Sequence, residues 1–203
     1  MEDVLLRITS RGEGVLKEKG SRFLSFAYPV TQVSEVESHL GQLKKKFYDA
    51  RHHCLAYRLG AQGQTSFSAD DREPGNSAGP PILAAIRSQG LTDTLVVVVR
   101  YFGGTKLGIR GLIEAYRDAA DRALAQSERV PIIPTVEFVI DYAYTQTSEV
   151  QKALHPFPVK ILDSTYDASC SQVLSIEAKE FSQLHQILLR IPIKIHSIST
   201  VDL

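Results

Sequence analysis

One stretch decides the fold: VVVVRYFGGTKLGIRGL, residues Val96–Leu112. Its β-branched run does not alternate with polar residues, which predicts a central strand over Leu95–Phe102 that is buried on both faces. Four glycines interleaved with Lys106 and Arg110 follow. A helical pattern then covers Leu107–Ala125, and its expected inward residues are Leu112, Ala115, Tyr116, Ala119, Ala123 and Leu124. A glycine-rich connection into a helix exposes backbone N–H groups beside the helix N-terminus, so this stretch predicts an anion site.

The glycine-rich stretch does not match a known nucleotide motif. A P-loop requires Lys and then Ser or Thr after its second glycine, whereas Ile109 and Arg110 follow Gly108. The dinucleotide-binding fingerprint is absent as well, and the glycines could serve only tight turns and close packing. The flanking cations favour contact with an anion or a polymer. The candidate ligand-binding residues are Arg100, Tyr101, Gly103, Gly104, Lys106, Gly108, Arg110 and Gly111.

Upstream of this stretch, the pattern predicts a domain of mixed strands and helices. We expect strands at residues 4–9 and 14–28, and a helix over Val33–Tyr48. A strand at residues 52–60 is expected to pair with residues 64–69. A loop then enters a short helix, with Pro81 in its first turn and Gly90 at its end.

Pro131 and Pro134 interrupt the helical pattern and mark a domain border near Arg129. After them the elements follow the order β-α-β-β-α-β, which is the ferredoxin-like order. The predicted fold class is therefore α+β, with one domain over residues 1–129 and a ferredoxin-like domain over residues 130–203.

Composition narrows the class of protein. The hydrophobic fraction is 43%, which is typical of a globular protein. Because 23 basic residues balance 23 acidic ones, no net charge attracts the protein to nucleic acid or membranes. The first 20 residues lack the apolar region of a signal peptide, and no apolar run is long enough to span a membrane. We expect a soluble, cytoplasmic protein whose two cysteines are reduced.

Two further segments hold candidate chemistry. Asp70, Asp71 and Glu73 could bind Mg²⁺, but they could equally cap the following turn, bind their own backbone, or pair with Arg72 and Arg100. The second interpretation is preferred unless the fold brings this loop beside the glycine-rich stretch. His53 is a poor activator of the neighbouring Cys54, because adjacent strand residues point to opposite faces. We predict no metal, no cofactor and no catalytic residue, and keep His53, Asp70, Asp71, Arg72 and Glu73 as accessory candidates.

Four segments together resemble the IMPACT/YigZ family. They are SRF at Ser21–Phe23, ARHHCLAYRLG at Ala50–Gly60, SADDREPGNSAGPPIL at Ser68–Leu83, and VVVVRYFGGTKLGIRGLIEAYRDAA at Val96–Ala120. Two departures stand out: Arg72 replaces the glycine of the usual DDGEP, and Arg110 lies between Gly108 and Gly111, where the family usually reads G-x-G-G-L.

The resemblance implies a fold and a process. The first domain would have the left-handed split β-α-β fold of some ribosomal proteins, of a domain of elongation factor G and of certain small-molecule kinases. The second domain, residues 130–203, would resemble the terminal domain of elongation factor G. Eukaryotic relatives regulate translation initiation through protein contacts, and the resemblance supplies no catalytic residue.

Three functions follow from these observations. The leading one is a non-enzymatic binding protein, linked to translation, that contacts RNA, the ribosome or a translation factor through residues 103–111. The second is a Mg²⁺-dependent enzyme acting on a phosphorylated small molecule, an analogy of fold rather than of site. The third is a module for protein interaction alone.

Overall fold

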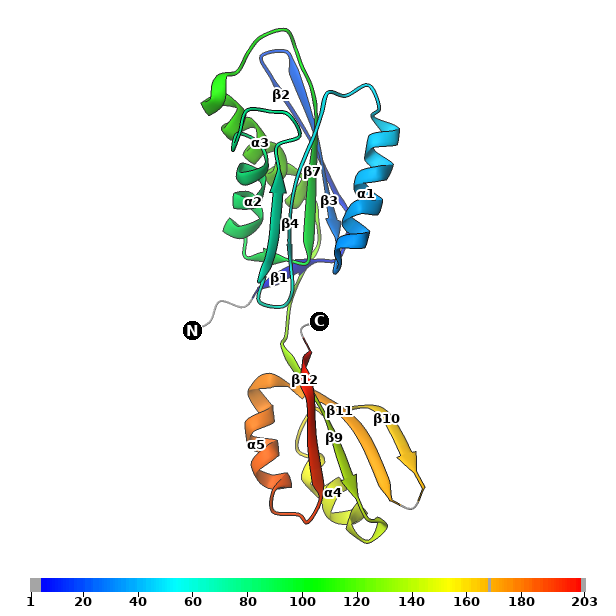
Figure 1. Cartoon of the computed structure of the whole chain (residues 1–203). Helices are drawn as coiled ribbons and strands as arrows, with labels where there is room; N and C mark the ends of the chain where they lie inside the picture. The colour runs from blue at the N-terminus through cyan, green and yellow to red at the C-terminus, as the bar shows by residue number, and fades with distance from the viewer. Residues whose placement is uncertain (1–4, 168, 202–203) are drawn as a thin grey trace. The chain divides into compact units, whose positions relative to one another are not determined.

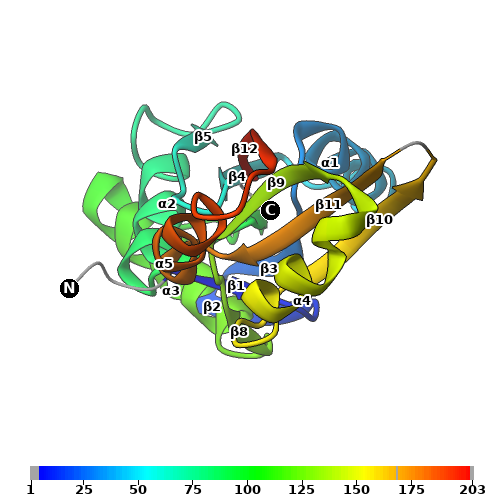
Figure 2. The same ribbon diagram turned by 90° about the horizontal axis from the view of Figure 1, so that it is seen from below.

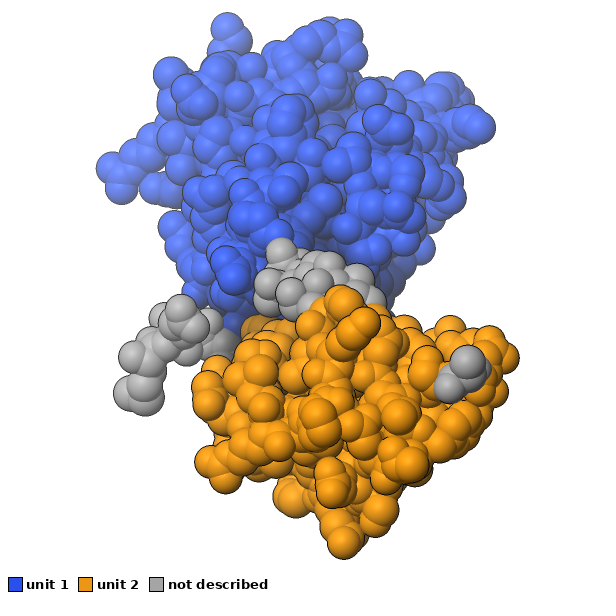
Figure 3. Space-filling model, turned by 60° about the horizontal axis from the view of Figure 1, so that its bottom comes forward, with its two compact units in different colours: residues 1–132 blue, residues 133–203 orange. Residues whose placement is uncertain are grey.

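A computed structural model describes residues 5–167 and 169–201. The chain divides into two compact units, Met1–Ile132 and Ile133–Leu203, coloured separately in Figure 3. Each unit combines helices with β-sheet, so the chain is an α+β protein. Within the described residues, no helix combines the length and apolarity needed to cross a membrane.

Unit 1 is built on a five-stranded antiparallel sheet (Figure 1). Its strand order is β2 (Gly12–Glu18), β3 (Ser21–Pro29), β7 (Thr94–Tyr101), β4 (His52–Leu59) and β5 (Thr65–Ala69). Successive residues of β7 enter opposite cores: Val96 and Val98 face one, and Val97 and Val99 face the other. The prediction of a central strand buried on both faces is confirmed.

Helices cover both faces of this sheet (Figure 1). Helix α1 (Val33–Lys46) packs on one face, through Val36 and Leu43. Helices α2 (Gly79–Ser88) and α3 (Gly108–Leu124) pack on the other. The predicted inward face of α3 is confirmed, because the following side chains are all buried: Leu112, Ala115, Tyr116, Ala119, Ala123 and Leu124.

The expected single strand over residues 14–28 is wrong. The segment folds as a hairpin, in which Glu18 of β2 pairs with Ser21 of β3. The two residues between them, Lys19 and Gly20, have φ angles of 45° and 80°. Two central residues with positive φ make the tight hairpin turn whose twist matches the flanking strands.

A small second sheet joins the two ends of unit 1. Strand β1 (Leu6–Ile8) lies between β6 (Leu91–Thr92), to which it is parallel, and β8 (Arg129–Pro131), to which it is antiparallel. Ile8 is buried in the core beneath α2 and α3. The first and last strands of unit 1 are therefore hydrogen-bonded neighbours.

Unit 2 has the predicted order of strands and helices. Its four-stranded antiparallel sheet has the order β10 (Lys160–Tyr166), β11 (Cys170–Glu177), β9 (Thr135–Tyr142) and β12 (Lys194–Val201). The 3-10 turn η1 (Tyr144–Gln146) precedes helix α4 (Thr147–Leu154), and α5 (Ala178–Leu188) follows β11. Helices α4 and α5 share one apolar core with the sheet and lie on the same face of it (Figure 2).

Candidate functional site

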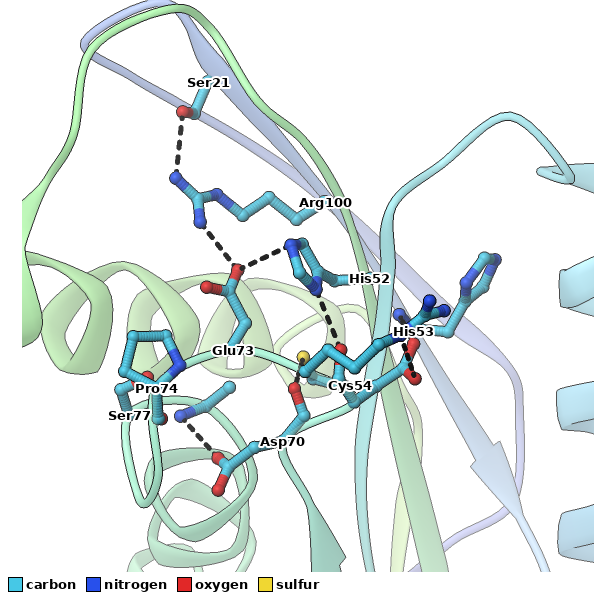
Figure 4. A network of polar contacts seen from close by, with 12 residues as sticks. Ser21, His52, His53, Cys54, Asp70, Glu73, Pro74, Ser77 and Arg100 are labelled. Atoms are coloured by element: carbon cyan, nitrogen blue, oxygen red, sulfur yellow. Dashed lines mark hydrogen bonds and ion pairs between the residues drawn. The ribbon is translucent and has the colours of Figure 1, made fainter.

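The fold brings the acidic loop beside the glycine-rich stretch at one end of the unit 1 sheet. Residues 70–78 connect β5 to α2, and residues 102–107 connect β7 to α3. Glu73 of the acidic loop reaches the end of strand β7, where its Oε1 lies 2.6 Å from Nη1 of Arg100 (Figure 4). The contact is an ion pair inside the protein.

Glu73 is the centre of a buried polar network. Its Oε1 accepts hydrogen bonds from Arg100 and, at 2.8 Å, from the hydroxyl of Tyr116 on α3. Nε2 of His52 lies 3.9 Å from the same oxygen, while Nδ1 donates to the carbonyl of Asp71 at 2.8 Å. One carboxylate thus ties together β4, β7, α3 and the acidic loop.

The network continues to the glycine-rich stretch through Ser21. The Ser21 hydroxyl accepts from Nη2 of Arg100 at 3.4 Å (Figure 4). It also accepts from the backbone N–H of Gly103 at 3.2 Å. Ser21 is fully buried. The start of the β7–α3 loop is therefore held by a chain of hydrogen bonds that begins at Glu73.

Of the two roles expected for Arg100, this geometry agrees with pairing to the acidic loop rather than with contact to a ligand. Its side chain is 6% exposed, against 4% for Glu73, and its guanidinium lies over the ring of Phe23. A buried cation that is already paired with a carboxylate is not available to neutralise a phosphate. Arg100 holds the loop in place, and any anion contact falls to the exposed cations beyond it.

The three acidic side chains are occupied by contacts within the protein. Asp70 accepts the backbone N–H groups of Asn76, Ala78 and Gly79, so it caps the start of α2. Asp71 accepts the N–H of His53 at 2.7 Å. In the described part of the chain, no group of three or more His, Cys, Asp and Glu could hold a metal ion. These contacts correspond to the second interpretation, in which the acidic residues cap a turn or pair within the protein.

Three further titratable side chains of this region, those of Cys54, Tyr116 and His53, are buried. Cys54 lies 3.0 Å from the carbonyl of Asp70 and 3.3 Å from the Tyr116 hydroxyl, and burial raises its pKa to about 12. Burial also raises the pKa of Tyr116. Burial lowers the pKa of His53, against the opposing effect of the Asp71 carboxylate. A thiol kept protonated is not a nucleophile at neutral pH.

The glycines of the stretch serve two different purposes. A Cβ on Gly103 would overlap the backbone of Gly20 and Ser21, so this glycine allows the hairpin turn to pack against the loop. Gly104 and Gly108 have φ angles of 89° and 74°, and nothing lies near where their Cβ atoms would be. Gly111 in the first turn of α3 packs on Leu107. The backbone at Gly104 and Gly108 is therefore open on its outer side.

The outer part of the β7–α3 loop is cationic and partly apolar. Lys106 is exposed, and the Arg110 side chain is 93% exposed beside Glu114, with Nε to Oε1 at 2.9 Å. Phe102 is 49% exposed and Ile109 62%. Arg110 therefore adds a positive charge to the surface of the protein.

Tyr101 is not free for stacking. Its hydroxyl donates to Oδ1 of Asp49 at 2.8 Å, and the guanidinium of Arg22 lies 4.8 Å from the ring centroid. The ring is half-buried between them. Tyr101 thus fixes the α1–β4 connection to the end of β7.

Arg72 adopts the backbone conformation that glycine favours. Its φ angle is 70°, in the left-handed region, and Asp71 before it has φ 39°. The side chain is 82% exposed, and its nearest carboxylate is that of Asp71 at 3.8 Å, not that of Asp70 or Glu73. The arginine therefore carries the strain that a glycine would avoid.

The sequence does not indicate a polar role for two residues that hold this site together. Ser21 belongs to a family motif, and Tyr116 lies on the expected inward face of α3. The serine is separated from Arg100 by 79 positions and the tyrosine from Glu73 by 43. A polar residue at a buried position of a strand or helix is the signal that could have indicated such a network.

Comparisons with known proteins find similarity to one family over most of the chain. The Impact N-terminal domain model matches residues 19–124. The IMPACT family member YigZ of Escherichia coli (strain K12) is 35% identical over 153 residues, 74% of each chain. An IMPACT family member of Haemophilus influenzae is 33% identical over 79% of each chain. A crystal structure described only as that of a hypothetical protein superposes with a TM-score of 0.72 at 28% identity, covering 99% of this chain and 100% of the other.

Proposed function

Because the chain belongs to the IMPACT family, we propose that it is a cytoplasmic, non-enzymatic binding protein linked to translation. Its ligand contacts the β7–α3 loop, and the partner is RNA, the ribosome or a translation factor. The family resemblance supports translation as the process. The inward position of Cys54 and of the three acidic side chains supports binding rather than chemistry.

One observation carries the proposal: the loop presents charge and open backbone together. Lys106 and Arg110 are exposed, and the backbone at Gly104 and Gly108 has no neighbour on its outer side. Helix α3 begins at Gly108 without a side-chain cap. Cations beside uncapped N–H groups suit a phosphate or carboxylate of a larger partner.

The buried network gives this loop a fixed shape before a partner arrives. Ser21 and Arg100 hold its first residues from inside, and Gly103 packs directly on the hairpin turn. A loop that is already ordered loses little conformational entropy on binding. In this proposal Glu73 and Arg100 are positioning residues and do not touch the ligand.

The same proposal includes the identity of the two domains. We assign residues 1–129 to an IMPACT-type domain with the split β-α-β fold. Residues 130–203 form a ferredoxin-like domain like the terminal domain of elongation factor G. The antiparallel order β10-β11-β9-β12 and the β-α-β-β-α-β sequence of elements support the second assignment.

The test is sedimentation of a cell lysate through sucrose gradients at low and high salt. Wild type is compared with Lys106→Ala/Arg110→Ala, and with Lys160→Ala/Lys194→Ala as a control that loses the same charge from exposed positions of unit 2. Arg100 is left intact, because its removal would leave Glu73 unpaired. We expect wild type and the control to sediment with ribosomal particles at low salt only, and the loop variant to stay near the top.

Two results would contradict the proposal. If all three proteins remain at the top of the gradient at low salt, the link to the ribosome is lost. If the loop variant sediments with wild type at every salt concentration, the β7–α3 loop is not the contact surface.

A further inference from the structure

Cations gather at the end of unit 1 that carries the β7–α3 loop. They come from the β2–β3 hairpin, the last turn of α1, the α1–β4 connection and the acidic loop, and each is exposed. We call this surface the cationic end; its members are Lys17, Lys19, Arg22, Lys44, Lys45, Lys46, Arg51, Arg72, Lys106 and Arg110. The whole chain carries equal numbers of basic and acidic residues, so this concentration is local.

Direct contacts bring these segments to the same end of the sheet (Figure 1). The hairpin turn meets the β7–α3 loop where Gly20 packs on Gly103. The α1–β4 connection is joined to β7 by the hydrogen bond from Tyr101 to Asp49. The loop and the end of α1 are thus parts of a single surface of unit 1.

Most of these cations have no carboxylate partner within the described residues. Among residues 5–167 and 169–201, only Arg72 and Arg110 of the cationic end have a carboxylate oxygen within 4.0 Å. Three of these cations, Lys44, Lys45 and Lys46, lie in the last turn of α1, where the helix dipole favours positive charge. Exposed cations without a carboxylate partner remain available to an anionic ligand.

Exposed aromatic side chains accompany the charges. Tyr48, directly after the end of α1, is 84% exposed, and Phe102 at the start of the loop is 49% exposed. Proteins that bind single-stranded nucleic acid stack its unpaired bases on aromatic side chains, while basic side chains contact the phosphates. Bases within a duplex are stacked on one another and offer no free face to such rings.

We propose that the cationic end binds single-stranded RNA along a path from the β7–α3 loop to the lysines at the end of α1. This inference rests on the proposed function and names its ligand class. Lys44, Lys45 and Lys46 contact phosphates, and Tyr48 stacks on a base. An acidic protein segment would use the charges but not the two exposed rings, so the surface favours RNA.

The test is fluorescence anisotropy with a labelled 15-residue oligouridylate and the full chain. The Lys44→Ala/Lys45→Ala/Lys46→Ala variant should bind at least about tenfold more weakly at low salt, with a salt slope shallower by about 2. The matched variant with arginine at the same three positions should keep the affinity of wild type. Tyr48→Ala should weaken binding by about fivefold or more and leave the salt slope unchanged.

The outcomes separate this inference from the function on which it rests. If Lys106→Ala/Arg110→Ala weakens binding but the three-alanine variant does not, the path to α1 is wrong and the loop proposal stands. If wild type does not bind the oligonucleotide but still sediments with ribosomal particles, single-stranded RNA is the wrong ligand class. Equal binding of a duplex, or equal competition by polyglutamate, would also overturn the inference. Thermal melting by circular dichroism confirms that each variant is folded.

Discussion

Replacing Glu73 by alanine should destabilise unit 1 far more than a typical loop substitution. The side chain accepts hydrogen bonds from Arg100 and Tyr116 and is almost fully buried. Alanine removes the only carboxylate within 4.0 Å of the Arg100 guanidinium among the described residues. The cation would remain in the interior without its counter-charge.

The size of the effect follows from that uncompensated charge. Breaking a buried ion pair by removing one partner costs about 3–5 kcal/mol of unfolding free energy. For a unit of about 130 residues, an unfolding entropy of about 2.1 cal/mol/K per residue converts this loss to a fall of about 11–18 °C in melting temperature. Glu73→Leu/Arg100→Met removes both charges and should recover most of the loss, because a buried pair replaced by apolar residues is often neutral.

Differential scanning calorimetry measures the effect directly. The chain contains no tryptophan, so circular dichroism is the natural second observable. Unit 2 has a separate core, and its transition serves as an internal reference that should not move. A fall of less than about 3 °C for Glu73→Ala, or a double variant as unstable as the single one, would refute the argument.

Four further predictions concern other residues. Cys54, whose pKa burial raises to about 12, should react with an alkylating reagent at pH 8 only after unfolding; rapid labelling of the native protein would contradict this. Burial lowers the pKa of His53, so below about pH 6.5 the unfolded state binds the proton first and stability falls. The urea midpoint should therefore drop more between pH 7.5 and 5.5 for wild type than for His53→Gln, and equal drops would count against it. Gly103→Ala should cost about 1–3 kcal/mol of unfolding free energy through overlap with the hairpin turn. Gly104→Ala, in open space, should cost about 1–2 kcal/mol through backbone strain alone; urea titrations measure both, and an unchanged midpoint for Gly103→Ala would contradict the overlap. Arg72→Gly should raise the unfolding free energy by up to about 1 kcal/mol in urea titrations, because φ is 70° there, and a destabilisation would contradict the assigned strain.

The elements were predictable where the pattern is local. The valines of β7 and the inward face of α3 follow from periodicity within one segment, and both are found as expected. The hairpin turn was missed because apolar residues on both sides of Lys19 and Gly20 resemble one long strand. A lysine with positive φ is uncommon, so only the glycine marked the turn.

The candidate site was less predictable, because its contacts join distant parts of the chain. Alternation along β7 places Arg100 on the same face as Val96 and Val98, so its inward direction was available from the sequence. Pairing of Arg100 with the acidic residues 70–73 was one of several alternatives from the sequence, which did not single out Glu73, 27 positions away in an irregular loop. Nothing in the sequence connects the lysines at the end of α1 with the β7–α3 loop; the hydrogen bond from Tyr101 to Asp49 joins the two segments.

The small sheet that joins the ends of unit 1 sets an order for folding during synthesis. Strand β1 leaves the ribosome first, yet its partners β6 and β8 begin at Leu91 and Arg129. At about 5–20 residues per second, β1 waits about 6–24 s for its second neighbour. The five-stranded sheet is complete in sequence by Tyr101 and the helix α3 that covers one face of it by Leu124, so the interior of unit 1 can assemble while its first strand is still unpaired on one side. A nascent chain halted before Arg129 should therefore be protected from proteolysis in the sheet but cut near its N-terminus.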